Sequence, residues 1–139
     1  MMVYDAERLV REAQEPLAHN LACVCLERDL TGWSGWPATY HEDQFTRVGT
    51  LARELRDEST LDEYHPAKTS YWSPDAPIAP RHYPYNQCGV WACITCGRLY
   101  LRHNDEGAYH SERRIRRVLP AHIVDAPFSG DAPPAGAAD

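Results

Sequence analysis

This 139-residue chain contains no apolar run as long as the about 18 residues that a transmembrane helix needs. The amino-terminal residues also lack the apolar stretch of a secretory signal peptide, because Asp5, Glu7 and Arg11 interrupt them. These two absences exclude a membrane-spanning helix and an ordinary secreted precursor. We therefore expect a soluble protein of the cytoplasm.

The motifs of several enzyme classes are missing as well. The sequence contains no GxSxG, P-loop, HExxH or GxGxxG pattern. Two short segments, His41–Asp43 and Asp62–His65, bring acidic and basic side chains together, but polar surface loops explain them more simply than catalysis does. We therefore expect that the protein is not an enzyme and has no catalytic residues.

The chain contains five cysteines. An odd number without a signal peptide argues against a disulfide framework and leaves reduced thiols or metal ligands. Cys93-Ile94-Thr95-Cys96-Gly97 has the shape of a zinc knuckle, because two thiolates spaced in this way can reach one ion across a tight turn. Gly97 relieves the backbone at that turn. The segment predicts a structural zinc site.

A closed zinc site requires four ligands. Cys88 lies five residues before Cys93 and is the third candidate. The fourth ligand is open, and His103 is our first choice because it follows the next strand directly. The other candidates are His82, His110 and one residue of the pair Cys23 and Cys25. We place that pair on a buried strand, take its thiols to project in opposite directions, and so expect at most one of them at the ion.

Two other interpretations of the knuckle stay open. A redox pair usually needs a helix N-terminus that lowers a thiol pKa, and Gly97 with the alternating strand after it argues against one. Simple burial is the other interpretation, because cysteine is among the most buried residue types. The prediction we carry forward is a structural zinc ion bound by Cys88, Cys93, Cys96 and His103.

Hydrophobic periodicity predicts an α+β fold, with a single domain over residues 1–125. Leu9, Ala13 and Leu17 recur at helical spacing and predict a helix over Tyr4–Ala18. We expect this amino-terminal helix to pack on a small antiparallel sheet that includes a zinc-knuckle-like hairpin. The predicted strands are Leu21–Leu26, Gln44–Val48, the two arms of Val90–His103, and Ala108–Ser111.

Four other segments are less regular. Thr50–Arg56 suits a short helix, and Glu112–Leu119 suits either a strand or a helix. Recurrent prolines prevent a helix in His65–Gln87 and favour extended chain laid on a surface. Residues 126–139 consist mainly of Pro, Ala, Gly and Asp, and we expect a disordered tail there.

The net charge of −6 is unevenly distributed. Residues 1–65 carry 13 acidic and 6 basic side chains, whereas residues 66–139 carry 7 acidic and 8 basic ones. An acidic surface attracts basic protein partners. Trp33, Trp36 and Trp72 are the residues that we expect at a protein interface, although for Trp33 and Trp36 a role in capping the core is favoured.

A set of residues, most of them in the second half of the chain, adds a resemblance. It is carried by Tyr64-His65-Pro66, by Tyr71 to Pro80, by Pro84-Tyr85-Asn86, and by Cys88, Trp91 and the knuckle. Over most of residues 21–125 the chain resembles a family of small uncharacterised proteobacterial proteins with a C-x4-C-x2-CG motif, often encoded beside polymorphic or secretion-system toxins. The resemblance implies an immunity protein that binds a cognate toxin and neutralises it.

A second function competes with this one. A zinc-ribbon nucleic-acid-binding protein would use the knuckle together with nearby arginines, which are Arg98, Arg102, Arg113, Arg114, Arg116 and Arg117. Such proteins are usually basic over much of one face, and this chain is acidic. We therefore expect a cognate toxin as the partner rather than a nucleic acid or a membrane.

Overall fold

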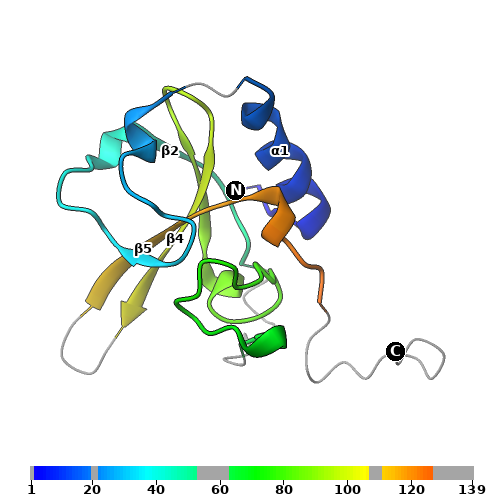
Figure 1. The fold of residues 1–139 in the computed structure, drawn as a ribbon. Helices are drawn as coiled ribbons and strands as arrows, with labels where there is room; N and C mark the ends of the chain where they lie inside the picture. Colours follow the sequence, from blue (N-terminus) through cyan, green and yellow to red (C-terminus); the bar gives the residue numbers. More distant parts are fainter. Residues whose placement is uncertain (1, 20–21, 53–62, 107–110, 127–139) are drawn as a thin grey trace, which may run out of the picture.

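The computed structural model describes residues 2–19, 22–52, 63–106 and 111–126 (Figure 1). Within them, a five-stranded sheet has the strand order β1-β5-β4-β3-β2, and every neighbouring pair is antiparallel. The strands are β1 (Ser34–Gly35), β2 (Phe45–Thr50), β3 (Gly89–Cys93), β4 (Leu99–Glu106) and β5 (Ser111–Arg117). Together with the helix α1 (Ala6–His19), this sheet confirms the predicted α+β class.

Helix α1 covers one face of the sheet (Figure 1). Its buried residues Leu9 and Ala13 belong to a core cluster that also contains Val90 of β3 and Leu101 of β4. We call this cluster the helix-side core. The spacing of Leu9 and Ala13 therefore predicted the buried face of the helix correctly. Leu17, the third residue of that pattern, is exposed, and the neighbouring Pro16 is buried instead.

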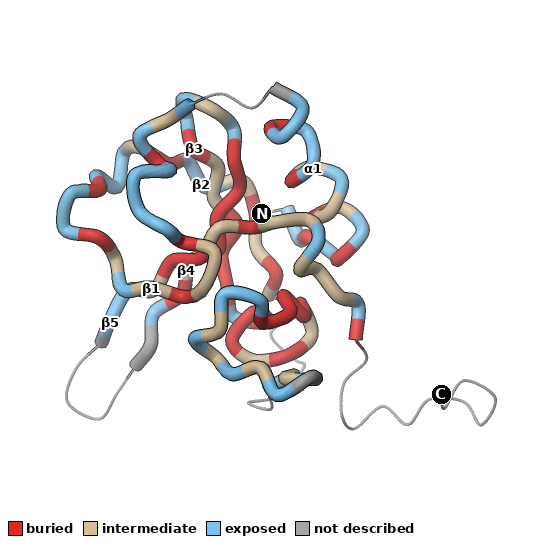
Figure 2. Tube along the Cα trace, viewed as in Figure 1, coloured by how far each residue is buried: buried red, intermediate tan, exposed pale blue. Residues whose placement is uncertain are grey.

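The opposite face of the sheet carries a second cluster, the cysteine-side core. Its buried members are Cys25, Leu30, Tyr40, Phe45, Cys93, Tyr100 and Ile115. Alternation along a strand sends neighbouring side chains to opposite faces, so Tyr100 enters this core while Leu101 enters the helix-side core. Figure 2 shows the result, with buried backbone running through the middle of the sheet and exposed segments around it.

The structure also tests the individual elements. The helix prediction and the hairpin arms β3 and β4 are confirmed, and the strand predicted to end at Val48 continues to Thr50. The segment left open after Ser111 is strand β5, which runs to Arg117. The predicted strand over Leu21–Leu26 is wrong, because residues Val24–Leu26 form a short 3-10 helix.

Parts of other predictions fall outside the described residues, namely the beginning of the strand at 108–111, most of the possible helix at 50–56, and the tail beyond residue 126. No helix in the described residues combines the length and the apolar composition that crossing a membrane requires.

The prolines exclude an α-helix from His65–Gln87, as predicted, but the segment forms turns and two short 3-10 helices and not the extended chain that we expected. A buried arginine of β5 holds it: the Arg116 guanidinium donates hydrogen bonds to the carbonyl oxygens of Ala76 (2.6 Å) and Pro74 (3.2 Å) and to the hydroxyl of Tyr85 (2.5 Å). Arg116 is 0% exposed. The guanidinium of Arg116 therefore contacts groups inside the protein and not solvent.

A candidate metal centre between the hairpin and a 3-10 turn

The turn between β3 and β4 positions two cysteines. Cys93 is the last residue of β3 and Cys96 lies within the turn. The Cys93 amide donates to the Arg98 carbonyl (2.9 Å), and the Gly97 amide donates to the Cys93 carbonyl (2.8 Å), which closes the turn. Gly97 has a φ of +81°, a conformation that glycine adopts without strain. The expected role of this glycine is confirmed.

A segment far away in the sequence supplies two more cysteines. Cys23 is extended (φ −154°, ψ 149°) and leads into the 3-10 helix Val24–Leu26. This geometry turns Cys25 inward to 0% exposure and leaves Val24 outward at 59%. Hydrophobicity alone would favour the reverse, since valine gains more from burial than a thiol does. The conformation is therefore organised around the sulfurs.

Two tyrosine hydroxyls fix the backbone at this point. Tyr40 and Tyr100 both donate hydrogen bonds to the carbonyl oxygen of Cys25, at 2.7 and 3.2 Å. Burial raises the pKa of both hydroxyls, so they remain protonated donors. Outer contacts of this kind orient a metal-ligating residue before the metal binds.

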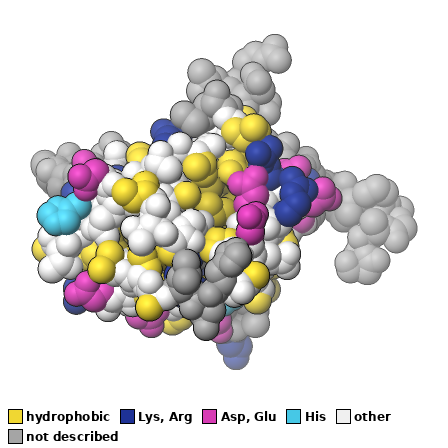
Figure 3. All heavy atoms as spheres, turned by 90° about the horizontal axis from the view of Figure 1, so that it is seen from above, with side chains coloured by type: hydrophobic (Ala, Val, Ile, Leu, Met, Phe, Trp, Pro, Cys, Tyr) yellow, Lys and Arg dark blue, Asp and Glu magenta, His cyan; other side chains and the backbone are white. Residues whose placement is uncertain are grey.

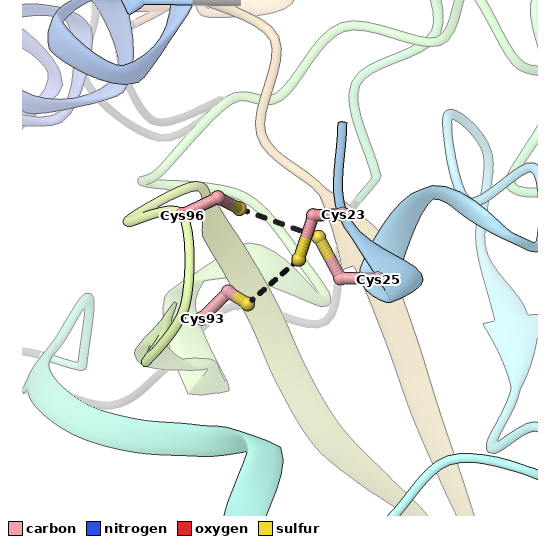
Figure 4. A group of neighbouring side chains, drawn as sticks. All are labelled: Cys23, Cys25, Cys93 and Cys96. Atoms are coloured by element: carbon pink, nitrogen blue, oxygen red, sulfur yellow. Dashed lines mark hydrogen bonds between the residues drawn. The ribbon is translucent and has the colours of Figure 1, made fainter. Parts of the chain in front are cut away.

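The four sulfurs converge on one point (Figure 4). The Sγ atoms of Cys23 and Cys93 are 3.6 Å apart, and those of Cys25 and Cys96 are 3.5 Å apart. All four sulfurs lie within 4.8 Å of one another. Tetrahedral coordination with Zn–S bonds of about 2.3 Å places sulfurs about 3.8 Å apart. The group therefore fits one tetrahedral ion with small adjustments, and the four cysteines can bind a metal.

The charges around the sulfurs also suit bound thiolates. Arg98 is buried beside Cys96, and among the described residues no carboxylate pairs with its guanidinium, whose Nε and Nη1 atoms have no hydrogen-bond partner. A buried cation without a counter-charge is costly. The sulfur of Cys96 is the partner of this side chain. A Zn²⁺ ion with four thiolates carries a net charge of −2, and this anionic centre would balance the charge of Arg98.

The thiols respond differently to their surroundings. Burial raises the pKa values of Cys25 and Cys93. For Cys93, the amides of Thr95 and Cys96 point at the sulfur and act in the opposite direction. Burial also opposes ionisation of Cys96, but the backbone amide and side chain of Arg98 outweigh it and lower the pKa of this thiol to about 7. Amide donors at the site thus stabilise thiolates, and a bound metal ion would stabilise them further.

The structure does not bring the whole predicted ligand set together. Cys93 and Cys96 are in the cluster, but Cys88 lies in the helix-side core, where its thiol donates to the Pro84 carbonyl (3.2 Å). The Nε2 atom of His103 forms a hydrogen bond with the hydroxyl of Tyr71 (2.9 Å). Cys88 and His103 are therefore replaced in the cluster by Cys23 and Cys25.

Both Cys23 and Cys25 lie in the cluster, whereas we expected at most one of them there. Two features explain the difference. The segment is a 3-10 turn and not a strand. Even in a strand, residues two positions apart face the same side, so Cys-x-Cys spacing is compatible with two ligands. That spacing is the signal in the sequence that pointed to the complete set.

The other candidate residues are separated in space. Trp33 is buried in the helix-side core, where its indole N–H donates to the hydroxyl of Tyr85 (3.2 Å). Trp36 is half-buried against the cysteine-side core. Trp72 is 52% exposed, and the Arg114 guanidinium stacks over its ring. Only Trp72 of the three has the exposure that a contact residue needs.

Comparisons with protein-family models, with curated proteins and with solved structures found no match for this chain.

Proposed function

We propose that the protein is a binding protein braced by one structural zinc ion, which Cys23, Cys25, Cys93 and Cys96 coordinate as thiolates. The observation that carries this proposal is the convergence of four sulfurs from two segments about 70 positions apart in the sequence. Tetrahedral sulfur sites in proteins hold zinc or iron. Zinc is the proposal because a single mononuclear ion with no redox role suffices to brace the fold.

A site of this composition is closed. Four protein sulfurs leave no coordination position for water or substrate, which a catalytic zinc site keeps open. The proposed ion therefore contributes stability and not Lewis-acid chemistry. This supports a protein that acts by binding rather than as an enzyme.

The ion would attach a segment that has little other anchorage. Between residues 22 and 29, Cys25 is the only buried residue and Cys23 is half-buried, while the others are exposed. Coordination of these two thiols would hold the segment against the β3–β4 turn. The exposed apolar side chains Val24, Leu26 and Ile94 flank the cysteines on these two segments and would become parts of one rigid surface.

This surface supports the binding of a partner protein. Figure 3 looks down on the end of the molecule that carries the β3–β4 turn, and it shows hydrophobic side chains in the middle of the face, with acidic and basic ones along an edge. Apolar centres with charged rims are typical of protein interfaces. The resemblance to immunity-type proteins and the acidic amino-terminal half favour a basic bacterial toxin as that partner.

Nucleic acid is the weaker candidate. Two of the arginines that it would use, Arg98 and Arg116, are buried, and the Arg116 guanidinium is occupied by internal hydrogen bonds. Arginines on β5 alternate between the two faces of the sheet, so they do not form one basic surface. A shift of DNA or RNA that weakens steeply with salt would reverse this preference.

The metal proposal is tested by metal analysis of the purified protein. The expected result is one zinc per chain, lost in the Cys25→Ser variant and kept in Cys88→Ala, which removes the one cysteine outside the cluster. A chain that purifies without metal, and does not take up zinc under reducing conditions, contradicts the proposal.

The binding proposal is tested by co-purification with the toxin candidate encoded beside the gene. We expect a complex that Val24→Asp and Ile94→Asp weaken at least tenfold while zinc is retained. Val3→Asp is the matched control, because Val3 is similarly exposed (53%) but pairs with Thr50 at the other end of β2. The absence of a complex at micromolar concentration contradicts a toxin partner, and equal effects of all three variants contradict the proposed surface.

A further inference from the structure

A second site lies on the cysteine side of the sheet, at the end of β3 that is remote from Cys93. It is a pocket of about 250 Å³. Its lining residues are Arg47, Gln87, Gly89, Trp91, Arg102, His103, Asn104 and Arg113. Three of these side chains are guanidinium groups and none is a carboxylate. The pocket contains no member of the cysteine cluster, so its chemistry is separate from the proposed zinc site.

The central group of this pocket is Arg102. Its Cζ atom lies 4.2 Å from the ring centroid of Trp91 and 4.5 Å from that of Trp36, so two aromatic rings hold the guanidinium in place. The side chain is 13% exposed. Its Nη1 atom is buried and has no hydrogen-bond partner among the described residues. A fixed cation with an unused donor is a pre-organised contact for an anion.

One carboxylate outside the lining already pairs with two of these arginines. Glu42, at the rim, forms ion pairs with Arg113 and with the Nη2 atom of Arg102 (3.4 Å). With Arg47 this leaves three positive charges against one negative charge, in a chain whose net charge is −6. Burial lowers the pKa of Arg102, and Glu42 only partly offsets this. A further anion would stabilise the charged guanidinium.

The floor of the pocket is open because residue 89 is glycine. A Cβ atom there would lie 3.0 Å from the indole nitrogen of Trp91 and 3.2 Å from the Cζ atom of Arg47. Among the described residues, no acceptor takes the indole N–H of Trp91. Two kinds of donor, an indole and guanidinium groups, therefore meet over one small space.

We propose that this pocket binds a phosphate group, as the free ion or as a phosphate monoester. Arginine forks match the geometry of phosphate oxygens, and a dianion suits the excess of positive charge. The volume is below that of pockets for larger organic ligands and suits one anionic group. Ring faces of Trp36 and Trp91 are occupied by Arg102, which disfavours stacking of a nucleobase and distinguishes this site from a single-strand nucleic-acid groove.

The test is a titration of the zinc-loaded full chain with inorganic phosphate and, separately, with O-phosphoserine, at constant ionic strength. Binding is followed by the NMR shift of the Trp91 indole N–H, assigned by its absence in Trp91→Phe. We expect a saturable shift with at least one of the two ligands and none with serine or chloride. Tighter binding of inorganic phosphate identifies the free ion as the ligand, and tighter binding of O-phosphoserine identifies a monoester. No saturable shift up to about 20 mM with either ligand overturns the proposal.

Variants then assign the binding to this pocket. Arg47→Gln removes an exposed guanidinium and should weaken binding about tenfold without affecting the fold. Glu42→Gln removes the competing carboxylate and should strengthen binding about threefold. Asp43→Asn is the matched control for net charge, because no ion pair joins Asp43 to these arginines, and it should leave the affinity unchanged. Equal effects of the Glu42 and Asp43 variants would show non-specific charge attraction and overturn the site.

Discussion

The stability of the fold should depend on the two cysteines of the 3-10 segment. The double variant Cys23→Ser/Cys25→Ser leaves Cys93 and Cys96 in place but removes the link between the segment and the β3–β4 turn. In the proposed zinc protein this link closes a loop between Cys25 and Cys96, which are 71 positions apart. The variant can no longer bind zinc with four thiolates, so it loses the stabilisation that an ion bound only to the folded chain provides.

The size of the effect follows from the affinity for zinc. A ligand that binds only the folded chain stabilises it by about 4 kcal/mol at 25 °C when its free concentration is about 1,000 times Kd. Domains are usually stable by about 5–15 kcal/mol, so this loss is a large fraction of the total. For a chain of this size it corresponds to a decrease in Tm of roughly 15 °C.

The assay is denaturant unfolding followed by circular dichroism, with and without zinc, under reducing conditions. Zinc should stabilise the wild-type chain and leave the double variant unchanged. Cys88→Ala is the control: it should lose about 1 kcal/mol from imperfect core packing yet keep the zinc-dependent increment. The reasoning is refuted if zinc stabilises wild type and double variant equally, or if neither responds to zinc and both unfold at the same denaturant concentration.

Three further outcomes follow from the surroundings of the cluster. Gly97→Ala should destabilise the chain by about 1 kcal/mol, because its φ of +81° strains any L side chain; thermal unfolding of the zinc-loaded protein measures this, and an unchanged Tm contradicts it. Arg98→Met should weaken zinc binding about tenfold in competition with a chelator, whereas Arg98→Lys, which keeps the charge, should weaken it less; equal losses contradict the charge argument. Tyr100→Phe should cost about 1 kcal/mol of unfolding free energy because it removes a hydrogen bond to the Cys25 carbonyl, and an increase in stability would contradict that role.

The sequence predicted those parts of the fold whose signals are local. Helix α1 and strands β3 and β4 have clear periodicity, and the structure contains them. Residues 22–26 show the limit of this approach, because a short apolar run suits a buried strand as well as it suits a turn. In this protein the turn brings Cys23 and Cys25 close to Cys93 and Cys96. These contacts join residues about 70 positions apart, so a local pattern does not show them.

The sequence predicted two of the four cysteines in the candidate site. The Cys93-x-x-Cys96-Gly97 spacing pointed to a metal site, and the structure brings those two thiols together with Cys23 and Cys25. Cys88 was the more attractive third ligand because it is near in sequence, yet strand β3 carries it away from Cys93 to the opposite end of the strand. An extended strand advances by about 3.3 Å per residue, so five positions along it place two cysteines far apart. Closeness in sequence was therefore a poor guide to the third ligand.

The arginine pocket could not be predicted from the sequence either. Arg47, Arg102 and Arg113 come from three strands, and their meeting depends on the register of β2, β3, β4 and β5. The basic run on β5 drew attention to neighbours in sequence, which a strand distributes to opposite faces.

X-ray absorption at the zinc edge of the purified, reduced protein tests the central claim most directly. The account predicts one zinc per chain with four sulfur ligands at about 2.3 Å and no nitrogen or oxygen in the first shell. A shell that contains histidine nitrogen or water oxygen, or a protein that cannot be loaded with zinc, would contradict a site built from Cys23, Cys25, Cys93 and Cys96.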